Sequence, residues 1–461
     1  MDKIRKQKAF YIGILLVTIG ILFNKWFIEK IISPDQHIES YRAIIFIVGI
    51  QALAIVLGGF LLVTRPKILN KIQFTLLFVS VLVAFLIAET SSRFWLRYIV
   101  TPGKKNRFTL YTNIDTERFR YTPHHYLNYC LTPNFKKGLL SHNSLGYRNS
   151  EFSIEKPTGV YRIVAVGGSS TYTTGVADNK KTFTAKLEQL LRDEYEYKDI
   201  HIINGGVPGY DSWNTLANLE FRILDLLPDL VIVYHGYNDL HARFVEPTTY
   251  RGDNSGKRKY WQEPTISFWE HSVFFRILSR NAGITKQASL QSFVNVTARK
   301  HSGYFGDNPM EILQQNPPVY FRRNLRNIAA IVKEHGIKIM FATWAYSPYF
   351  DDYPSTPFYQ QGIKEHNKVS KDVANQYNLP LFDFAAVMPK DKQYWCNGPH
   401  VNEQGALIKA RLFAEFIDAN ELIPTSLIMF AMYSVDYLIL KILHGIKFKN
   451  IYEKMFGWLA D

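Results

Sequence analysis

Four short stretches of the chain hold glycines and polar residues of the types that could carry out chemistry. The first is Val164–Tyr172, where two glycines directly precede Ser169 at the end of an apolar run. Such a turn can present a nucleophile, bind a phosphate, or simply join a strand to a helix. The other three stretches are residues 204–210 with Gly209, residues 236–239 with Asn238, and residues 397–402 with His400.

Together these four stretches contain the parts that acyl transfer requires. A serine, a glycine that exposes its backbone, an amide donor and a histidine can supply a nucleophile, oxyanion donors and a base. Each type also has an ordinary structural use, because glycines after strands form turns and Asn-Asp pairs cap helices. The combination indicates chemistry only if the fold brings the four stretches together.

From about residue 160 the chain alternates between strands and helices, which is the pattern of a mostly parallel sheet with helices on both faces. The carboxyl ends of parallel strands lie along one edge, where ligands of such sheets bind. The first three polar stretches follow strands and are expected at that edge. The predicted strands are Tyr161–Val166, Ile200–Ile203, Leu230–Tyr234, Ile337–Thr343 and Leu379–Phe382, with helices that begin near Phe183 and at about 214–227, 322–335, 358–377 and 404–418.

In this order, the four stretches resemble the blocks of the SGNH (GDSL) hydrolase superfamily. The similarity runs from about residue 121 to 418, and residues 143–148 resemble the lead-in of membrane-attached bacterial members. The nucleophile block is matched with Gly168 at the position before the serine, where the family more usually has aspartate. The resemblance implies a flavodoxin-like three-layer α/β/α domain with a mostly parallel five-stranded sheet.

The matched positions imply a role for each candidate residue. Ser169 matches the nucleophile and His400 the base, which a serine hydroxyl needs within hydrogen-bond reach at neutral pH. Gly209 and Asn238 match the oxyanion-hole residues, and the Ser169 N–H would be a third donor. Each such donor is typically worth ~10²–10³ in rate.

One catalytic position departs from the family pattern. The family usually has an aspartate three residues before its histidine, and this chain has Asn397 there. In a serine protease the same exchange costs ~10⁴ in turnover, because the histidine takes the wrong tautomer, whereas papain-like enzymes use asparagine to orient the ring. Asn397 could orient His400 without adding charge, a backbone carbonyl could do so, or the site could be slow.

Three apolar runs open the chain, at Ala9–Ile28, Ala43–Val63 and Ile72–Trp95. About 20 helical residues cross a bilayer core of roughly 30 Å, so residues 1–98 are predicted to be a three-helix transmembrane region. Lysines and arginines precede the first run and lie between the second and third. This charge pattern predicts a multi-pass membrane protein with a cytoplasmic N-terminus and an extracytoplasmic catalytic domain.

The remaining segments are assigned by composition. Residues 99–150 are predicted to be a connector that packs on the catalytic domain, which occupies residues 151–420. Residues 241–318 interrupt the alternation as an insertion, either a surface excursion or a lid or membrane-facing flap, since aromatic and basic residues suit a headgroup interface. The apolar stretch within residues 421–461 is predicted to be an interfacial helix or a fourth span.

Charge and cysteine content limit the partners. The formal net charge of the 461 residues is +14, but the basic residues are dispersed beside apolar runs, which favours lipid headgroups over nucleic acid. Cys130 and Cys396 form no metal-binding motif, so neither a metal nor a cofactor is expected, and a disulfide between them stays open.

The sequence therefore predicts a membrane-anchored serine esterase or deacylase that acts on an acyl ester of a lipid, glycan or cell-envelope polymer. The expected partners are membrane lipids, the acylated substrate and envelope-assembly proteins. One alternative is an O-acyltransferase with the same acyl-enzyme; another is a weakly active or inactive SGNH-like binding subunit. Phosphate binding by the glycine turn fits poorly, because neither Gly-x-x-x-x-Gly-Lys nor Gly-x-Gly-x-x-Gly occurs there.

Overall fold

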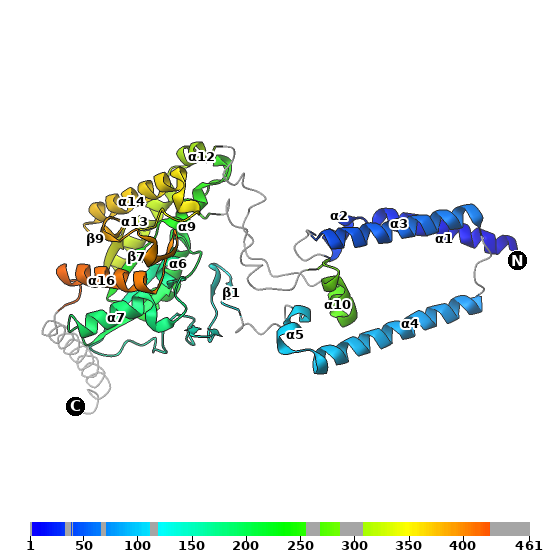
Figure 1. The fold of residues 1–461 in the computed structure, drawn as a ribbon, viewed down its shortest axis with the longest axis horizontal. Helices are drawn as coiled ribbons and strands as arrows, with labels where there is room; N and C mark the ends of the chain where they lie inside the picture. Colours follow the sequence, from blue (N-terminus) through cyan, green and yellow to red (C-terminus); the bar gives the residue numbers. More distant parts are fainter. Residues whose placement is uncertain are drawn as a thin grey trace, which may run out of the picture. The chain divides into compact units, whose positions relative to one another are not determined.

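The chain divides into two compact units (Figure 1). The helical unit consists of residues 1–116 and 262–295, and the sheet unit of residues 117–261 and 296–461. The predicted apolar segment at the C-terminus lies outside the described residues from residue 425 onward. The computed structural model describes residues 2–32, 38, 40–65, 71–110, 119–254, 268–285 and 308–424.

Two helices of the helical unit are long and apolar enough to cross a membrane. They are α3 (Tyr41–Thr64) and a continuous helix over Ile72–Ile99, which comprises most of α4 (Lys71–Phe94) and a π-helical turn. Most of their large apolar side chains are exposed, which is stable in lipid but not in water. By length and composition, two to three helices of this unit could span a membrane.

The first apolar run, which the sequence predicted as one membrane helix, is a bent pair of helices. Helix α1 (Asp2–Leu22) and helix α2 (Lys25–Ile32) meet at 76°. Asn24 lies at the bend, where its Oδ1 accepts the N–H of Phe27 at 3.0 Å and its Nδ2 donates to the carbonyl of Ile21 at 3.3 Å. One side chain thus satisfies backbone groups of both helix ends, which stabilises the break.

Part of the predicted insertion folds within the helical unit. Helix α10 (Val273–Asn281) begins beside Glu89 of α4. The Glu89 carboxylate accepts the N–H groups of Val273 at 3.0 Å and Phe274 at 2.9 Å, and the hydroxyl of Ser272 at 2.7 Å. A carboxylate at a helix N-terminus satisfies unpaired N–H groups and complements the helix dipole.

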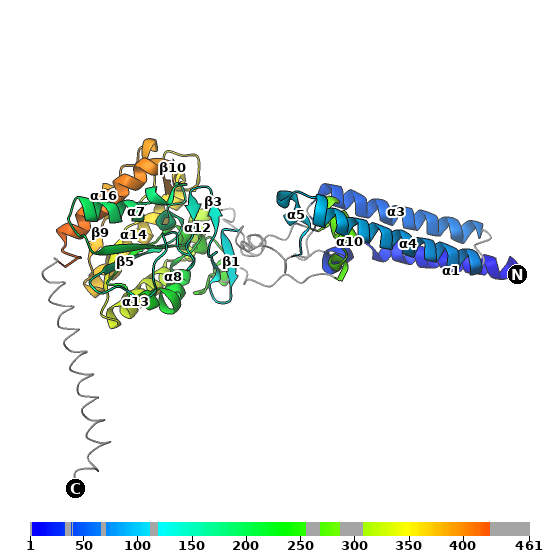
Figure 2. The ribbon, with the colours of Figure 1, turned by 90° about the horizontal axis from the view of Figure 1, so that it is seen from below.

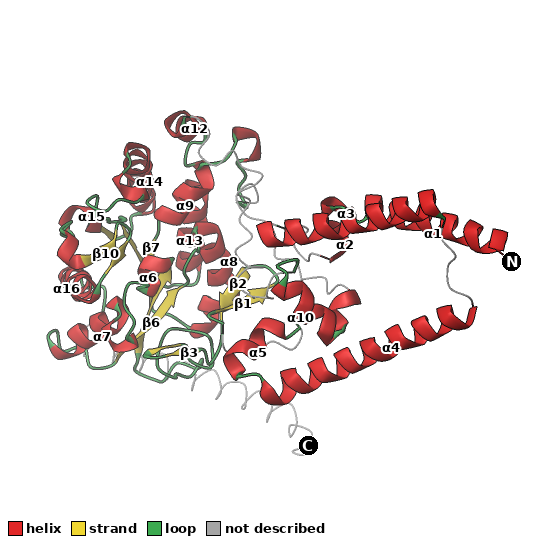
Figure 3. Ribbon diagram, turned by 45° about the vertical axis from the view of Figure 1, so that its right-hand side comes forward, coloured by secondary structure: helices red, strands yellow, loops and turns green. Residues whose placement is uncertain are grey.

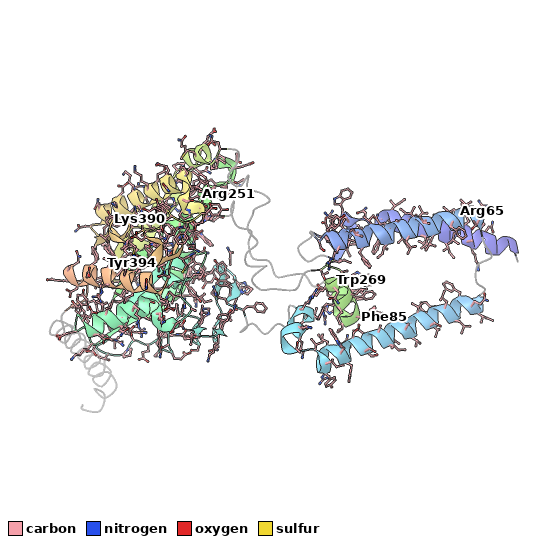
Figure 4. The ribbon with its side chains drawn as sticks, in the orientation of Figure 1. Arg65, Phe85, Arg251, Trp269, Lys390 and Tyr394 are labelled. Atoms are coloured by element: carbon pink, nitrogen blue, oxygen red, sulfur yellow. The ribbon has the colours of Figure 1, made fainter. Side chains whose placement is uncertain are left out.

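Apolar and polar contacts complete this packing. Phe85 of α4 lies against Phe275 with ring centroids 5.5 Å apart, and Trp269 packs on the same ring at 5.8 Å (Figure 4). Arg276 and Arg280 are buried and donate to backbone carbonyls at and beside the end of α5 (Pro102–Phe108). The insertion segment therefore joins α4 to α5 inside the helical unit.

The sheet unit contains a five-stranded sheet in the order β6-β5-β7-β8-β9, and all four neighbouring pairs are parallel. This confirms the predicted fold class. The last two strands are shorter than predicted, and β9 is an edge strand preceded by Pro380, which has no N–H for a ladder. The strands are β5 (Tyr161–Gly167), β6 (Ile200–Gly206), β7 (Leu230–Tyr234), β8 (Lys338–Ala342) and β9 (Leu381–Phe382).

Helices cover both faces of this sheet (Figures 2 and 3). Ile163 and Ala165 of β5 pack in one core cluster with side chains of α7 and α16, whereas Val164 and Val166 pack in a second cluster with side chains of α13 and α14. Every residue of β5 is buried, as expected for a central parallel strand. The helices are α6 (Ser169–Tyr172), α7 (Phe183–Asp193), α8 (Ser212–Asn218), α9 (Tyr237–Arg243), α12 (Pro309–Gln315), α13 (Val319–Glu334), α14 (Pro357–Tyr377), α15 (Phe384–Val387) and α16 (Glu403–Ala419).

The described part of the predicted connector that belongs to the sheet unit forms two small hairpins. Strand β1 (Tyr121–His124) pairs with β2 (Asn128–Leu131), and β3 (Lys136–Lys137) pairs with β4 (Leu140–Ser141). Tyr129 of β2 donates its hydroxyl to the carbonyl of Pro208 at 2.6 Å. The connector thus reaches the loop that follows β6.

We expect replacement of Glu89 by leucine to loosen α10. The change removes the acceptor for two N–H groups and one hydroxyl at the start of α10, and the loss of a helix cap costs ~1 kcal/mol or more, about a fivefold rise in the open population. Hydrogen exchange of peptides that cover α10, in the detergent-solubilised full chain, measures this change.

Arg93→Met is the matched control for Glu89→Leu. It removes the exposed ion pair between Arg93 and Glu89 (2.7 Å) and leaves the contacts with α10 in place. Exchange in α10 that is equally fast in both variants, or unchanged in Glu89→Leu, contradicts the assignment of Glu89 as the cap.

Candidate active site

The strand order brings three of the polar stretches to one edge of the sheet. Ser169 follows β5, Gly209 follows β6, and Asn238 lies in α9 directly after β7. Strand β5 lies between β6 and β7. The chain therefore passes from β5 to β6 on one side and then crosses back to β7 on the other side. This is the topological switch point, where sheets of this kind bind ligands.

The histidine stretch contacts the serine directly. The Ser169 hydroxyl donates to Nε2 of His400 with an Oγ–Nε2 distance of 2.7 Å. On the other side of the ring, Nδ1 of His400 lies 2.9 Å from Oδ1 of Asn397. The hairpin of β10 (Trp395–Asn397) and β11 (His400–Val401) holds both residues.

The hydrogen bonds of Asn397 determine which tautomer His400 adopts. The same side-chain atom of Asn397 also accepts the backbone N–H of His400 at 3.0 Å. A backbone N–H can only donate, so the Asn397 atom beside the ring is the amide oxygen. Nδ1 of His400 therefore carries a hydrogen, and Nε2 is left as an acceptor for the Ser169 hydroxyl. Asn397 can orient the ring as an aspartate would, although it adds no negative charge.

The turn before Ser169 lies against the amide of Asn238. A side chain at Gly168 would collide with this amide, because a Cβ there would lie 2.4 Å from Nδ2 of Asn238. The carbonyl of Tyr210 accepts from the same Nδ2 at 2.7 Å and fixes the orientation of the amide. Gly209 has a φ of +85°, which L side chains rarely adopt. These features suit the three candidate oxyanion donors, the N–H groups of Ser169 and Gly209 and the amide of Asn238.

Asp239 connects two of the stretches. Its buried carboxylate accepts the N–H of Ser212 at 3.0 Å and the Ser212 hydroxyl at 2.5 Å. The residue next to Asn238 thereby holds the loop that contains Gly209. In this Asn-Asp pair, Asp239 has a structural role through its bonds to Ser212, whereas Asn238 lies at the candidate site.

The turn that precedes His400 is held by hydrogen bonds to both backbone groups of Gly398, its N–H and its carbonyl. The Gly398 N–H donates to Oδ2 of Asp352 at 2.7 Å, and the Gly398 carbonyl accepts the N–H of Ser347 at 2.9 Å. Both partners lie in the loop after β8. The sequence offered no signal for Asp352 or Ser347, since more than 40 residues separate them from Gly398.

Arg148 supports the segment behind the nucleophile. It is fully buried, and its two terminal nitrogens donate to four carbonyls within residues 172–177 at 2.7 to 3.2 Å. Its Nε donates to Asn179 at 2.9 Å. All five donors of a guanidinium are thus used, which explains why an arginine ends the stretch at residues 143–148.

Burial and, to a smaller extent, the positive charge of Lys409 together lower the pKa of His400 to about 4. No carboxylate contributes to this pKa. His400 is therefore neutral and able to accept a proton at neutral pH, but it holds that proton weakly.

The structure gives no metal or disulfide role to the remaining candidates. Among the described residues, no group of three His, Cys, Asp or Glu side chains could hold a metal ion. Cys130 is a buried free thiol and Cys396 an exposed one. The disulfide that the sequence left open is not formed.

The family model for the GDSL-like lipase/acylhydrolase family matches residues 165–408, just over half of the chain. A lipase/acylhydrolase from Enterococcus faecalis is 18% identical, with 57% of this chain and 97% of that chain covered and a TM-score of 0.34. An acetylxylan esterase from Geobacillus stearothermophilus is 16% identical, with 57% and 96% covered and a TM-score of 0.35. No curated protein matches the chain.

We expect Asn397→Asp to keep or raise the turnover of an ester substrate, whereas Asn397→Ala lowers it by ~10² or more, since the ring loses its orienting acceptor. An aspartate can accept the same two hydrogen bonds and would also stabilise the imidazolium. Steady-state kinetics with p-nitrophenyl acetate measure both effects. A collapse of turnover in a folded Asn397→Asp variant would show that the position requires the amide.

The pH dependence follows from the low pKa of His400. The ring is the base only when it is unprotonated, so kcat/KM should stay level as the pH falls from 7 and decline only near pH 4, where an ordinary histidine would decline near 6.5. Asn397→Asp should move this decline to higher pH, because a carboxylate favours the protonated ring.

Brief exposure to the low pH followed by assay at pH 7 separates reversible protonation from unfolding. A reversible midpoint near 6.5 in the unmodified chain contradicts the lowered pKa of His400.

Proposed function

The chain belongs to the GDSL-like lipase/acylhydrolase family, and we propose that it is a membrane-anchored serine esterase. Its substrate is an acyl ester of a lipid, glycan or cell-envelope polymer. The observation that carries this proposal is the chain of hydrogen bonds from Ser169 through His400 to Asn397. The nucleophile, the base and the orienting group are already within hydrogen-bonding distance of one another.

Acylation uses these groups in sequence. As the Ser169 oxygen attacks the ester carbonyl, its proton passes to Nε2 of His400 over the existing 2.7 Å hydrogen bond. The carbonyl oxygen becomes an oxyanion, to which the N–H groups of Ser169 and Gly209 and the Asn238 amide donate. When the intermediate collapses, the ester C–O bond breaks and the His400 proton goes to the departing alcohol.

Deacylation repeats the steps with a second nucleophile. Water attacks the acyl-enzyme and gives its proton to His400. The bond between the acyl carbon and the Ser169 oxygen then breaks, the His400 proton passes to that oxygen, and the acid leaves a free Ser169 hydroxyl. If an alcohol of a second sugar or lipid enters instead of water, the same acyl-enzyme gives O-acyl transfer. The chemistry of the three residues is identical in the two cases.

The helical unit supports action at a membrane. Its α3 and the continuous helix over Ile72–Ile99 have the length and composition of membrane spans. Lysines and arginines at the start of α1 and in the segment that joins α3 to α4 favour a cytoplasmic N-terminus. With three spans, the chain after Ile99 would be extracytoplasmic, where acylated lipids and envelope polymers are the available substrates.

We expect a fluorophosphonate probe to label the full chain at Ser169. Labelling requires a nucleophilic serine and its base, so it should vanish in Ser169→Ala and fall at least ~10³-fold in rate in His400→Ala. In-gel fluorescence of the purified protein in detergent measures it. Ser150→Ala and His335→Ala, which change an exposed serine and an exposed histidine elsewhere in the sheet unit, should label normally.

Two results would contradict the proposal. A folded chain that resists labelling would favour the binding-subunit alternative, and labelling that survives in Ser169→Ala would place the nucleophile elsewhere. Comparing hydrolysis of an ester in lipid vesicles with that of a soluble ester then tests whether the substrate lies at the bilayer.

A further inference from the structure

We propose that Lys409 and Ser170 are positioning residues that hold the nucleophile turn in register with the histidine loop. The inference rests on the proposed function, since it concerns how Ser169 and His400 meet. Ser170 lies in the first of the four sequence stretches and Lys409 in none of them. Neither residue was a candidate for a catalytic role. Both act on the reaction through their neighbours.

Lys409 is buried behind the nucleophile turn. Its side chain is 1% exposed, and its Nζ donates to the carbonyl of Ser170 at 3.1 Å. The Nζ also lies 3.9 Å from the ring centre of Tyr234 and 4.0 Å from that of Phe183. Within the part of the chain that the structure describes, no carboxylate forms an ion pair with this lysine, and burial lowers its pKa well below the usual range.

The environment of Lys409 does not suggest that this residue is there to stabilise the fold. Burying an amine costs free energy that one hydrogen bond and two ring faces offset only in part, and apolar residues of similar volume often replace buried charges at no loss of stability. The neighbouring positions on this face of α16 are apolar: Ala406, Ala410 and Phe413 are buried. The lysine is therefore explained by what its Nζ contacts.

Ser170 makes a second connection in the same place. Its hydroxyl donates to the carbonyl of Pro399 at 3.0 Å. Pro399 directly precedes His400, and Lys409 lies in α16, which begins three residues after His400. One residue next to the nucleophile is thus bonded to the chain on both sides of the base.

The two bonds fix a distance that no local structure sets. Ser169 and His400 are 231 residues apart, yet their reacting atoms must stay at 2.7 Å. Proton transfer requires this approach, and a displacement of about 1 Å can cost ~10²-fold in rate. Loosening either bond should lower the rate per site without abolishing the nucleophile.

The test compares Lys409→Met, which keeps the apolar volume but lacks the donor, with Ser170→Ala and the double variant. We expect kcat for p-nitrophenyl acetate to fall ~10-fold or more in Lys409→Met, with KM changed less than about threefold, because substrate binding is untouched. Ser170→Ala should fall in the same way. The double variant should lose less than the product of the two, since both bonds hold one register.

Active-site titration with the fluorophosphonate probe separates positioning from misfolding. Slow labelling that reaches the same final occupancy as the unmodified chain means that every site is present and works slowly. A kcat loss that matches a loss of titratable sites means a structural role only and overturns the proposal, as does an unchanged kcat in a folded variant.

The matched control is Arg411→Met, which removes an exposed cation from the same helix by breaking its ion pair with Glu194. It should leave kcat unchanged, and an equal loss of kcat there also counts against the proposal. If Lys409→Met does not fold, Lys409→Gln, which keeps a donor of shorter reach, replaces it with the same readouts. Failure of the unmodified chain to label would instead contradict the proposed function.

Discussion

The hydrogen bond between the Ser169 hydroxyl and Nε2 of His400 is the contact that the candidate site requires and that the sheet unit assembles from distant parts of the chain. It joins the end of β5 to a hairpin that the chain reaches only after four further strands and their covering helices. The parallel sheet brings the strand ends to one edge, and the hairpin of β10 and β11 holds His400 against Ser169 there. Arg148, Asp239 and Lys409 each hold one of the segments that meet there.

Asn397 can fill one of the two roles that an aspartate usually has at this position: it orients the histidine ring but does not stabilise its positive charge. Its amide oxygen accepts both the ring and the backbone N–H of His400, so the tautomer is set by geometry. No carboxylate lowers the cost of the imidazolium, and burial and Lys409 both disfavour it. The ring of His400 is thus oriented to accept a proton, but its basicity is low.

The helical unit is completed by residues far along the chain. Glu89 would be an isolated carboxylate in an apolar helix, but it caps α10, which comes from the middle of the predicted insertion. Phe85 and Phe275 add an apolar contact beside it. The chain therefore returns to the apolar helices after entering the sheet unit, and residues on both sides of that return belong to the sheet unit.

The sequence by itself determined the elements and the chemistry of the candidate site. Apolar runs of strand length and helical periodicity are local properties, so the five parallel strands and the long apolar helices could be predicted from them. The order of the four polar stretches likewise indicated Ser169, Gly209, Asn238 and His400 as candidates. The rule for parallel strands placed the first three at a common edge, whereas the position of His400 came from the tertiary structure.

Only the tertiary structure decided what supports them. The bonds of Lys409 to the Ser170 carbonyl and of Asp352 to the Gly398 N–H join residues with no shared periodicity or motif. The same holds for Glu89 and α10, and for the bend at Asn24, where a single apolar run becomes two helices. Almost any residue can supply the backbone N–H or carbonyl of such a hydrogen bond, so the residue type at that position gives no indication of the bond. Such partners are therefore fixed by the folded path of the chain and leave no signature in the sequence.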